Sequence, residues 1–126
     1  MTGQNNQIEL NVLLAEDDAM NVIVVSKFLQ RWGIICDVAR NGQEAVERAR
    51  AKKYDVILMD MYMPLMNGVD ASKEIRTFDQ TTKIFALSAD ASPEMKEQAI
   101  HGGISDFVTK PFNPEELHFK LSNLKA

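Results

Sequence analysis

The sequence predicts an α/β fold of five strand–helix units, in which a doubly wound parallel sheet is covered by helices on both faces. Five short apolar runs alternate with five longer segments whose apolar residues recur at helical spacing. Such regular alternation favours a parallel sheet with right-handed crossovers. In a sheet of this kind, ligands bind beyond the carboxyl ends of the strands. The residues that follow the strands therefore matter most for function.

Five apolar runs are expected as strands, because each has the short length that a buried strand requires. In chain order they cover Val12–Ala15, Ile34–Ala39, Val56–Met59, Lys83–Leu87 and Ser105–Thr109. The third run stops at a carboxylate, Asp60. An acid at the end of a buried strand is poorly solvated unless something nearby needs its charge.

Helices are expected after each strand, where start or stop residues frame the helical spacing. The thirteen residues from Met20 to Trp32 are too many for a strand in a small domain. Asn41 has capping-box spacing to Glu44, and Ser92 precedes a proline that suits a first helical turn. The expected helices cover Met20–Trp32, Asn41 to about Lys53, Asn67 through Phe78, Ser92 to Gly102, and Asn113 through Leu124.

Composition narrows the possible functions. The 126 residues suit one domain, with 1–7 as a disordered lead-in and 8–126 as the folded part. A net charge of −4 argues against direct nucleic-acid binding, and no apolar run approaches the roughly 18 residues that insert in a membrane. One cysteine, Cys36, excludes an internal disulfide and fits a reducing, cytoplasmic location. His101 and His118 are expected on the surface.

Reactive side chains follow four of the five predicted strands. Because parallel strands end at one edge of the sheet, these side chains should share a pocket. They are Glu16 and Asp17 after the first strand, Asp60 after the third, Ser88 after the fourth and Lys110 after the fifth.

This set of side chains points to phosphoryl chemistry. Three close carboxylates repel one another and attract a divalent cation, and oxygen donors without histidine or cysteine favour Mg²⁺. A hydroxyl and a lysine beside that cation suit the oxygens of a phosphoryl group. A carboxylate can itself be the nucleophile and form an aspartyl phosphate. Asp60 is the central candidate for that nucleophile.

Four segments of the sequence resemble the receiver domain of two-component response regulators. They are Leu13–Asp18, Val56–Gly68, Ala86–Ala89 and Phe107–Phe112, and the resemblance extends from about Glu9 to the C-terminus. It implies the flavodoxin-like strand order 2-1-3-4-5. It also implies a phosphorylation-activated switch in two-component or phosphorelay signalling, with Mg²⁺ as cofactor.

The resemblance assigns roles by position. Asp60 would be the phosphoacceptor, and Mg²⁺ would be held by Glu16, Asp17, Asp60 and the backbone carbonyl of Tyr62. The residues expected to bind the phosphoryl group or to switch are Ser88, Ala89, Lys110 and Phe107. Lys110–Pro111 matches a peptide bond that is often cis in the family. Tyr62 and Asp90 would flank the path of the attacking water.

The resemblance also implies partners. A histidine kinase or a histidine phosphotransfer protein would donate the phosphoryl group, and a downstream protein or domain would bind the face of the fourth helix, fifth strand and fifth helix. Self-catalysed phosphorylation and dephosphorylation would be weak, so the domain is not expected to be an enzyme. Phe107 replaces the commoner tyrosine of the family and can also be read as an ordinary edge-strand aromatic. The chain could be a stand-alone receiver, a receiver of a membrane-bound hybrid histidine kinase, or a receiver cut from a longer regulator.

Three rival functions fit fewer residues. A haloacid-dehalogenase-like phosphatase needs an acid two residues after its nucleophile, where this chain has Tyr62, and usually a cap domain. A flavodoxin would cradle a phosphate in its first loop, where Glu16–Asp18 would repel one. A degenerate receiver that only docks a partner is disfavoured because every pocket residue is present.

Overall fold

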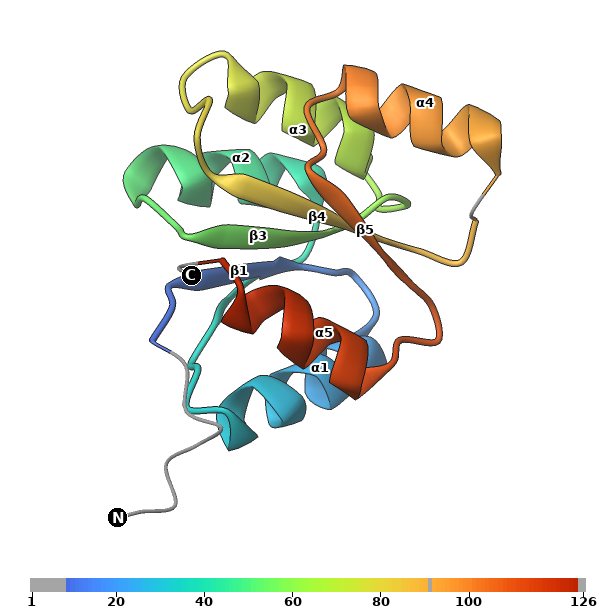
Figure 1. Cartoon of the computed structure of the whole chain (residues 1–126). Helices are drawn as coiled ribbons and strands as arrows, with labels where there is room; N and C mark the ends of the chain where they lie inside the picture. The colour runs from blue at the N-terminus through green and yellow to red at the C-terminus, as the bar shows by residue number, and fades with distance from the viewer. Residues whose placement is uncertain (1–8, 91, 125–126) are drawn as a thin grey trace.

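The computed structural model describes residues 9–90 and 92–124, and within them five strands alternate with five helices. All strands pair in parallel in the order β2-β1-β3-β4-β5, which confirms the predicted fold and strand order (Figure 1). The expected lead-in, 1–7, lies outside the described residues. The strands are β1 (Val12–Ala15), β2 (Asp37–Ala39), β3 (Val56–Asp60), β4 (Lys83–Ser88) and β5 (Asp106–Thr109).

The helices form a layer on each face of the sheet. Figure 1 shows α1 and α5 on one face and α2, α3 and α4 on the other. Their bounds are α1 (Ala19–Arg31), α2 (Gly42–Ala51), α3 (Gly68–Arg76), α4 (Pro93–His101) and α5 (Pro114–Ser122). None of these helices combines the length and apolar character that crossing a bilayer requires.

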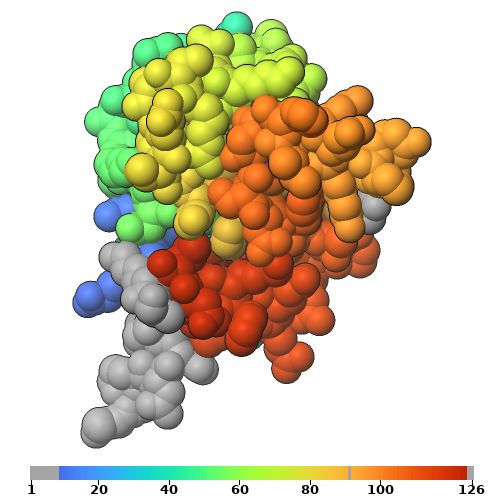
Figure 2. Space-filling view, turned by 45° about the horizontal axis from the view of Figure 1, so that its top comes forward, coloured from blue at the N-terminus to red at the C-terminus, as the bar shows by residue number. Residues whose placement is uncertain are grey.

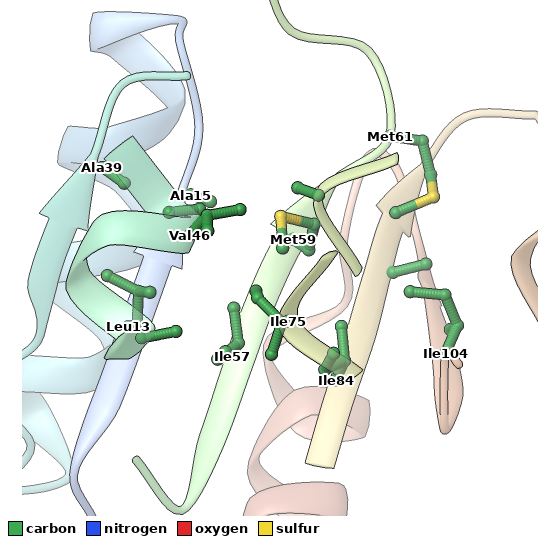
Figure 3. Close-up of a cluster of buried hydrophobic side chains, with 14 of the residues drawn as sticks. Leu13, Ala15, Ala39, Val46, Ile57, Met59, Met61, Ile75, Ile84 and Ile104 are labelled. Atoms are coloured by element: carbon green, nitrogen blue, oxygen red, sulfur yellow. The ribbon is translucent and has the colours of Figure 1, made fainter. Parts of the chain in front are cut away.

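Strand alternation divides the buried side chains into two cores. Leu13, Ile57 and Ile84 point toward α2, α3 and α4 (Figure 3), whereas Leu14 and Leu58 point toward α1 and α5. Each of these five side chains is fully buried, which stabilises the fold by about 1.5–3 kcal/mol per residue. Since all five residues of β3 are buried, the strand that ends at Asp60 is held firmly from both faces.

Side-chain caps determine where the helices begin. In α2, Asn41 Oδ1 accepts a hydrogen bond from the Glu44 N–H at 2.8 Å, and Glu44 Oε1 accepts one from the Arg40 N–H at 3.1 Å. The capping box predicted from the spacing is formed only in part, because Asn41 caps the helix as expected but Glu44 bonds the N–H of Arg40, one residue before the cap, rather than that of Asn41. Each cap satisfies backbone donors and contributes about 1 kcal/mol. The N-cap residues of the five helices are Asp18, Asn41, Asn67, Ser92 and Asn113.

Three sequence-based expectations were wrong in detail. The second strand begins at Asp37 rather than Ile34, because β2 pairs only with β1 and only over three residues. The third helix ends at Arg76 rather than extending through Phe78. The centre of the Phe78 ring instead lies 4.4 Å from Cζ of the Arg50 guanidinium. His118 is partly buried rather than on the surface, since its ring packs edge-on against Trp32.

Candidate functional site

Four strands deliver polar side chains to the same edge of the sheet. Glu16 follows β1, Asp60 and Ser88 are the last residues of β3 and β4, and Lys110 follows β5. The parallel register pairs Asp60 with Leu87 and Ser88 with Thr109, so the strand ends lie level with one another. The structure therefore brings together the residues that the sequence predicted to meet.

Lys110 contacts two buried carboxylates. Its Nζ donates to Glu16 Oε1 at 3.1 Å and lies 3.3 Å from Asp60 Oδ2. Glu16 is 1% exposed and Asp60 is 5% exposed. The Lys110 backbone is held as well, because its N–H donates to the Ser88 carbonyl at 3.0 Å. The Lys110–Pro111 peptide bond is cis. One ammonium group thus faces two acids in a poorly solvated site.

The charges of this cluster are not balanced. Burial and the neighbouring Glu16 carboxyl raise the pKa of Asp60 to about 6, although the Tyr62 N–H and Lys110 oppose the shift. Burial alone would lower the pKa of Lys110, but Glu16 and Asp60 raise it overall. The site therefore keeps its lysine charged and disfavours a second ionised acid.

A third carboxylate, that of Asp17, lies at the solvent-exposed side of the cluster. Oxygen atoms of Glu16, Asp17 and Asp60 all lie within 4.8 Å of one another, and Asp17 is exposed. Glu16 is oriented by the Asp18 N–H, which donates to its Oε2 at 3.2 Å. A set of carboxylate oxygens with an open side suits Mg²⁺, which keeps several waters and uses one or two carboxylates. The residues present fit such an ion.

The loop after Asp60 packs closely against the strand end. The Tyr62 N–H donates to Asp60 Oδ1 at 3.2 Å, and the Gly68 N–H donates to the Met61 carbonyl at 3.0 Å. A Cβ on Gly68 would lie 2.3 Å from the Asp60 carbonyl oxygen. Glycine is therefore required for α3 to start this close to β3.

The Ser88 hydroxyl is engaged by its own loop. It accepts a hydrogen bond from the Asp90 N–H at 3.0 Å and donates one to the Asp90 carbonyl at 3.1 Å. The Asp90 carboxylate in turn accepts from the Tyr62 hydroxyl at 3.2 Å and from the Ser92 N–H at 2.9 Å. The sequence placed Tyr62 and Asp90 beside the site but did not predict that they bond to each other. The sequence did hold a signal for the bond between Asp90 and Ser92, because the Asp-x-Ser spacing before Pro93 is typical of a side-chain turn at a helix start. It held none for the bond between Tyr62 and Asp90.

Two further predicted residues lie at the margin of the site. Ala89 is exposed in the loop between β4 and α4. Phe107 of β5 is half-buried against the core under α4, and Lys96 Nζ lies 5.9 Å from the centre of its ring. Phe107 is therefore positioned between the edge of the sheet and α4.

Comparison with known proteins identifies the family. The sequence profile of the response regulator receiver domain matches residues 12–122. The chain belongs to this family. A receiver domain is a signalling phosphoacceptor domain of two-component and phosphorelay systems rather than a conventional enzyme.

Relatives of this receiver domain include both short and long proteins. The two-component response regulator ORR41 of Oryza sativa subsp. japonica is 38% identical over 120 residues, which cover 92% of this chain and 94% of ORR41. The autoinducer 2 sensor kinase/phosphatase LuxQ of Vibrio vulnificus is 35% identical over 118 residues, which cover 93% of this chain. The chain spans only 14% of LuxQ and 19% of the transcription factor SKN7 of Saccharomyces cerevisiae.

Solved receiver structures superpose closely on this receiver domain. The receiver of the sensor histidine kinase PA1611 from Pseudomonas aeruginosa, determined with a magnesium ion in its active-site cleft, has a TM-score of 0.87 and 32% identity over 93% of this chain and 98% of that one. The receiver of Ssk1 from Saccharomyces cerevisiae, crystallised with the histidine phosphotransfer protein Ypd1, has a TM-score of 0.85 and 33% identity over 92% of this chain and 87% of that one.

Proposed function

We propose that Asp60 accepts a phosphoryl group from a phosphohistidine and that this modification switches the receiver domain between two states. The observation that carries the proposal is the setting of Asp60. It lies at the end of a fully buried strand, 3.3 Å from Lys110 Nζ and within 4.8 Å of the Glu16 and Asp17 oxygens. A rigid nucleophile beside a fixed cation and a cation-binding acid pair is suited to phosphoryl transfer.

In the proposed reaction, an Asp60 carboxylate oxygen bonds to phosphorus as the phosphorus–nitrogen bond of the donor breaks and the imidazole departs. Lys110 is close enough to Asp60 to hold one phosphoryl oxygen. The Ser88 hydroxyl can donate to another once it leaves Asp90. Mg²⁺ held by Glu16, Asp17, Asp60 and the Tyr62 carbonyl would offset the negative charge of the oxygens. Water would then hydrolyse the adduct slowly, because the residue two positions after Asp60 is Tyr62, which is not an acid that could assist the reaction.

The test is covalent labelling with acetyl phosphate and Mg²⁺, followed by intact-mass measurement. The wild-type chain should gain one phosphoryl group, and Asp60→Asn should gain none. Asp70→Asn is the matched control, because Asp70 is an exposed acid in the first turn of α3. Labelling that persists in Asp60→Asn would disprove the assignment. A folded wild-type chain that takes no label would favour a receiver that only docks a partner.

A histidine phosphotransfer protein or histidine kinase is the proposed donor, and α1 is its proposed docking site. Met20, Ile23 and Val24 expose apolar side chains on the first turns of α1, next to the acidic cluster. Beside them, a hollow of about 170 Å³ is lined by Val24, Phe28, Phe112 and also by Glu16 and Lys110. The apolar surface is thus continuous with the phosphoacceptor site, as docking of a phosphohistidine helix requires. The Ssk1 receiver supports this choice, because it was crystallised with a phosphotransfer protein.

A negative charge introduced on the apolar surface of α1 tests this docking site. Ile23→Glu should slow phosphoryl transfer from a phosphorylated phosphotransfer protein but leave labelling by acetyl phosphate unchanged. Ile35→Glu is the matched control, because Ile35 is an exposed isoleucine located before β2, at the opposite edge of the sheet. Equal transfer rates for both variants would rule out the α1 surface. Because such donors are intracellular kinases and their relays, we propose a cytoplasmic location for the domain.

The output face is proposed to be the surface formed by α4, β5 and α5. In Figure 2, the segments coloured orange to red, which include these elements, lie next to one another. Ile100 of α4 and Phe119 of α5 are exposed, and Phe107 lies on β5, an edge strand of the sheet. Release of Ser88 from Asp90 would move the loop that begins α4, which could change the packing of Phe107 under that helix. Amide chemical shifts of the three elements should therefore change when beryllofluoride, a phosphoryl mimic, is added.

A further inference from the structure

Tyr62 and Asp90 connect the phosphoacceptor loop to the switch loop, although they lie 28 residues apart. Tyr62 contributes at both ends, because its backbone N–H donates to Asp60 Oδ1 and its hydroxyl donates to Asp90 Oδ2, both at 3.2 Å. Asp90 also binds on two sides. Its carboxylate accepts from Tyr62 and from Ser92, the N-cap of α4, while its backbone makes both hydrogen bonds of the Ser88 hydroxyl.

This arrangement determines where the Ser88 hydroxyl points. A hydroxyl has one proton to donate, and in this structure Ser88 gives it to the Asp90 carbonyl. It cannot donate to a phosphoryl oxygen on Asp60 until that bond breaks. Movement of the Asp90 backbone away from Ser88 would pull on the Asp90 carboxylate, which Tyr62 holds from across the site and Ser92 holds from the start of α4.

We propose that the hydrogen bond between Tyr62 and Asp90 is a latch that holds the Ser88 hydroxyl away from Asp60 and so sets how readily the receiver domain enters its phosphorylated state. Tyr62 is in this sense a positioning residue that acts through Asp90 on Ser88. The inference rests on the proposed function, because it takes Asp60 as the phosphoacceptor and Ser88 as the switch hydroxyl.

Tyr62→Phe tests the latch most directly, because it removes the hydroxyl and keeps the ring. The dissociation constant of beryllofluoride, measured with saturating Mg²⁺, should fall about two- to tenfold, the effect of one hydrogen bond that is absent from the bound state. In the free Tyr62→Phe protein, the Asp90 amide resonance should move toward its beryllofluoride-bound position. A purely structural role would lower the melting temperature without improving affinity.

Two background variants show whether the effect passes through Asp90 and Ser88. In Asp90→Ala, the latch is already absent, so adding Tyr62→Phe should change the beryllofluoride affinity no further. In Ser88→Ala, the hydroxyl that the latch restrains is missing, so Tyr62→Phe should again have no effect. A tighter affinity that persists in either background would mean that Tyr62 acts on the ligand directly, and the latch would be wrong.

The outcomes separate the latch from the function on which it rests. The latch alone would be overturned if Tyr62→Phe binds beryllofluoride no more tightly than the wild type does, while the wild type binds it and Asp60→Asn does not. A wild type that binds no beryllofluoride, or an Asp60→Asn variant that binds it normally, would overturn the proposed function and the latch with it.

Discussion

Asp60 occupies a site where an ionised carboxylate is poorly tolerated in the absence of a cation. It is buried beside Glu16, and its pKa is raised to about 6 by burial and by that second carboxyl. Asp60→Asn removes the charge and keeps the shape, while Lys110 retains its bond to Glu16. In buffer with a chelator at neutral pH, the variant should be about 1 kcal/mol more stable, which raises the melting temperature by roughly 4 °C. A lower melting temperature would mean that Lys110 outweighs the repulsion.

Tyr62 is also predicted to control the lifetime of the phosphorylated state through its bulk. Tyr62 is 58% exposed and stands two residues after Asp60, where we expect it to flank the path of the attacking water. Tyr62→Ala should speed loss of the phosphoryl group about fivefold, since excluding water protects a reactive adduct. Tyr62→Phe is the control and should keep the wild-type lifetime, because it preserves the ring. An unchanged decay rate in Tyr62→Ala would disprove shielding; the rate can be followed by intact mass after removal of acetyl phosphate.

Among the elements, strands and caps were predictable and two element ends were not. Apolar runs and capping residues depend on local sequence, which is why β1, β3, β4 and the cap at Asn41 were expected correctly. Ile34 and Phe78 have the residue types of a strand and a helix, but their conformations depend on partners elsewhere. Ile34 is buried without a ladder, and Phe78 stacks on Arg50 of another helix. Local propensity cannot report such tertiary contacts.

The start of α3 depends on the absence of a side chain at Gly68. A methyl group on Gly68 would lie 2.3 Å from the Asp60 carbonyl oxygen and 2.9 Å from Met61 Cα, so backbone atoms would have to move. Gly68→Ala should destabilise the fold by about 2–4 kcal/mol in urea denaturation. Gly102→Ala is the control, because the nearest atom there is a Val69 methyl at 3.1 Å, and it should cost clearly less. A neutral Gly68→Ala would show that the loop can yield.

The topology of the whole molecule explains why the residues of the site could be predicted from the sequence, whereas the hydrogen bonds between them could not. Parallel strands necessarily bring Glu16, Asp60, Ser88 and Lys110 to one edge, so residue type and strand position sufficed. The bond from Lys110 to Glu16 and the link between Tyr62 and Asp90 depend on rotamers and loop shape. Neither is encoded in spacing along the chain.

The opposite edge of the sheet holds an ionic network that should govern acid stability. Burial alone would raise the pKa of Asp79, but Lys53 at 2.8 Å and hydrogen bonds from Thr82 and Thr81 hold it well below its ordinary range. A depressed folded-state pKa contributes stability above the unfolded value of about 3.9, and that contribution is lost as the pH falls toward the folded value.

Asp79→Asn should therefore be about 1–3 kcal/mol less stable than wild type at pH 7, and the difference should shrink as the pH falls below about 4. Thermal melts between pH 7 and pH 3 measure both quantities. Asp106→Asn is the matched control, since Asp106 pairs with Lys120 at 2.7 Å on the surface, where an ion pair contributes about 0–1 kcal/mol. A pH-independent difference at Asp79 would mean that its role is packing rather than charge.

Binding of Mg²⁺ should raise the stability of the whole domain, because the ion would bind the folded cluster and not the unfolded chain. At a free Mg²⁺ concentration about ten times the dissociation constant, linkage predicts a gain of about 1.4 kcal/mol, or several degrees in melting temperature. Asp17→Asn should reduce this shift, since Asp17 is the exposed acid of the cluster and its loss costs the apo fold little. Sodium chloride at matched ionic strength controls for screening. Equal shifts with sodium and magnesium, or an undiminished shift in Asp17→Asn, would count against a specific site at this cluster.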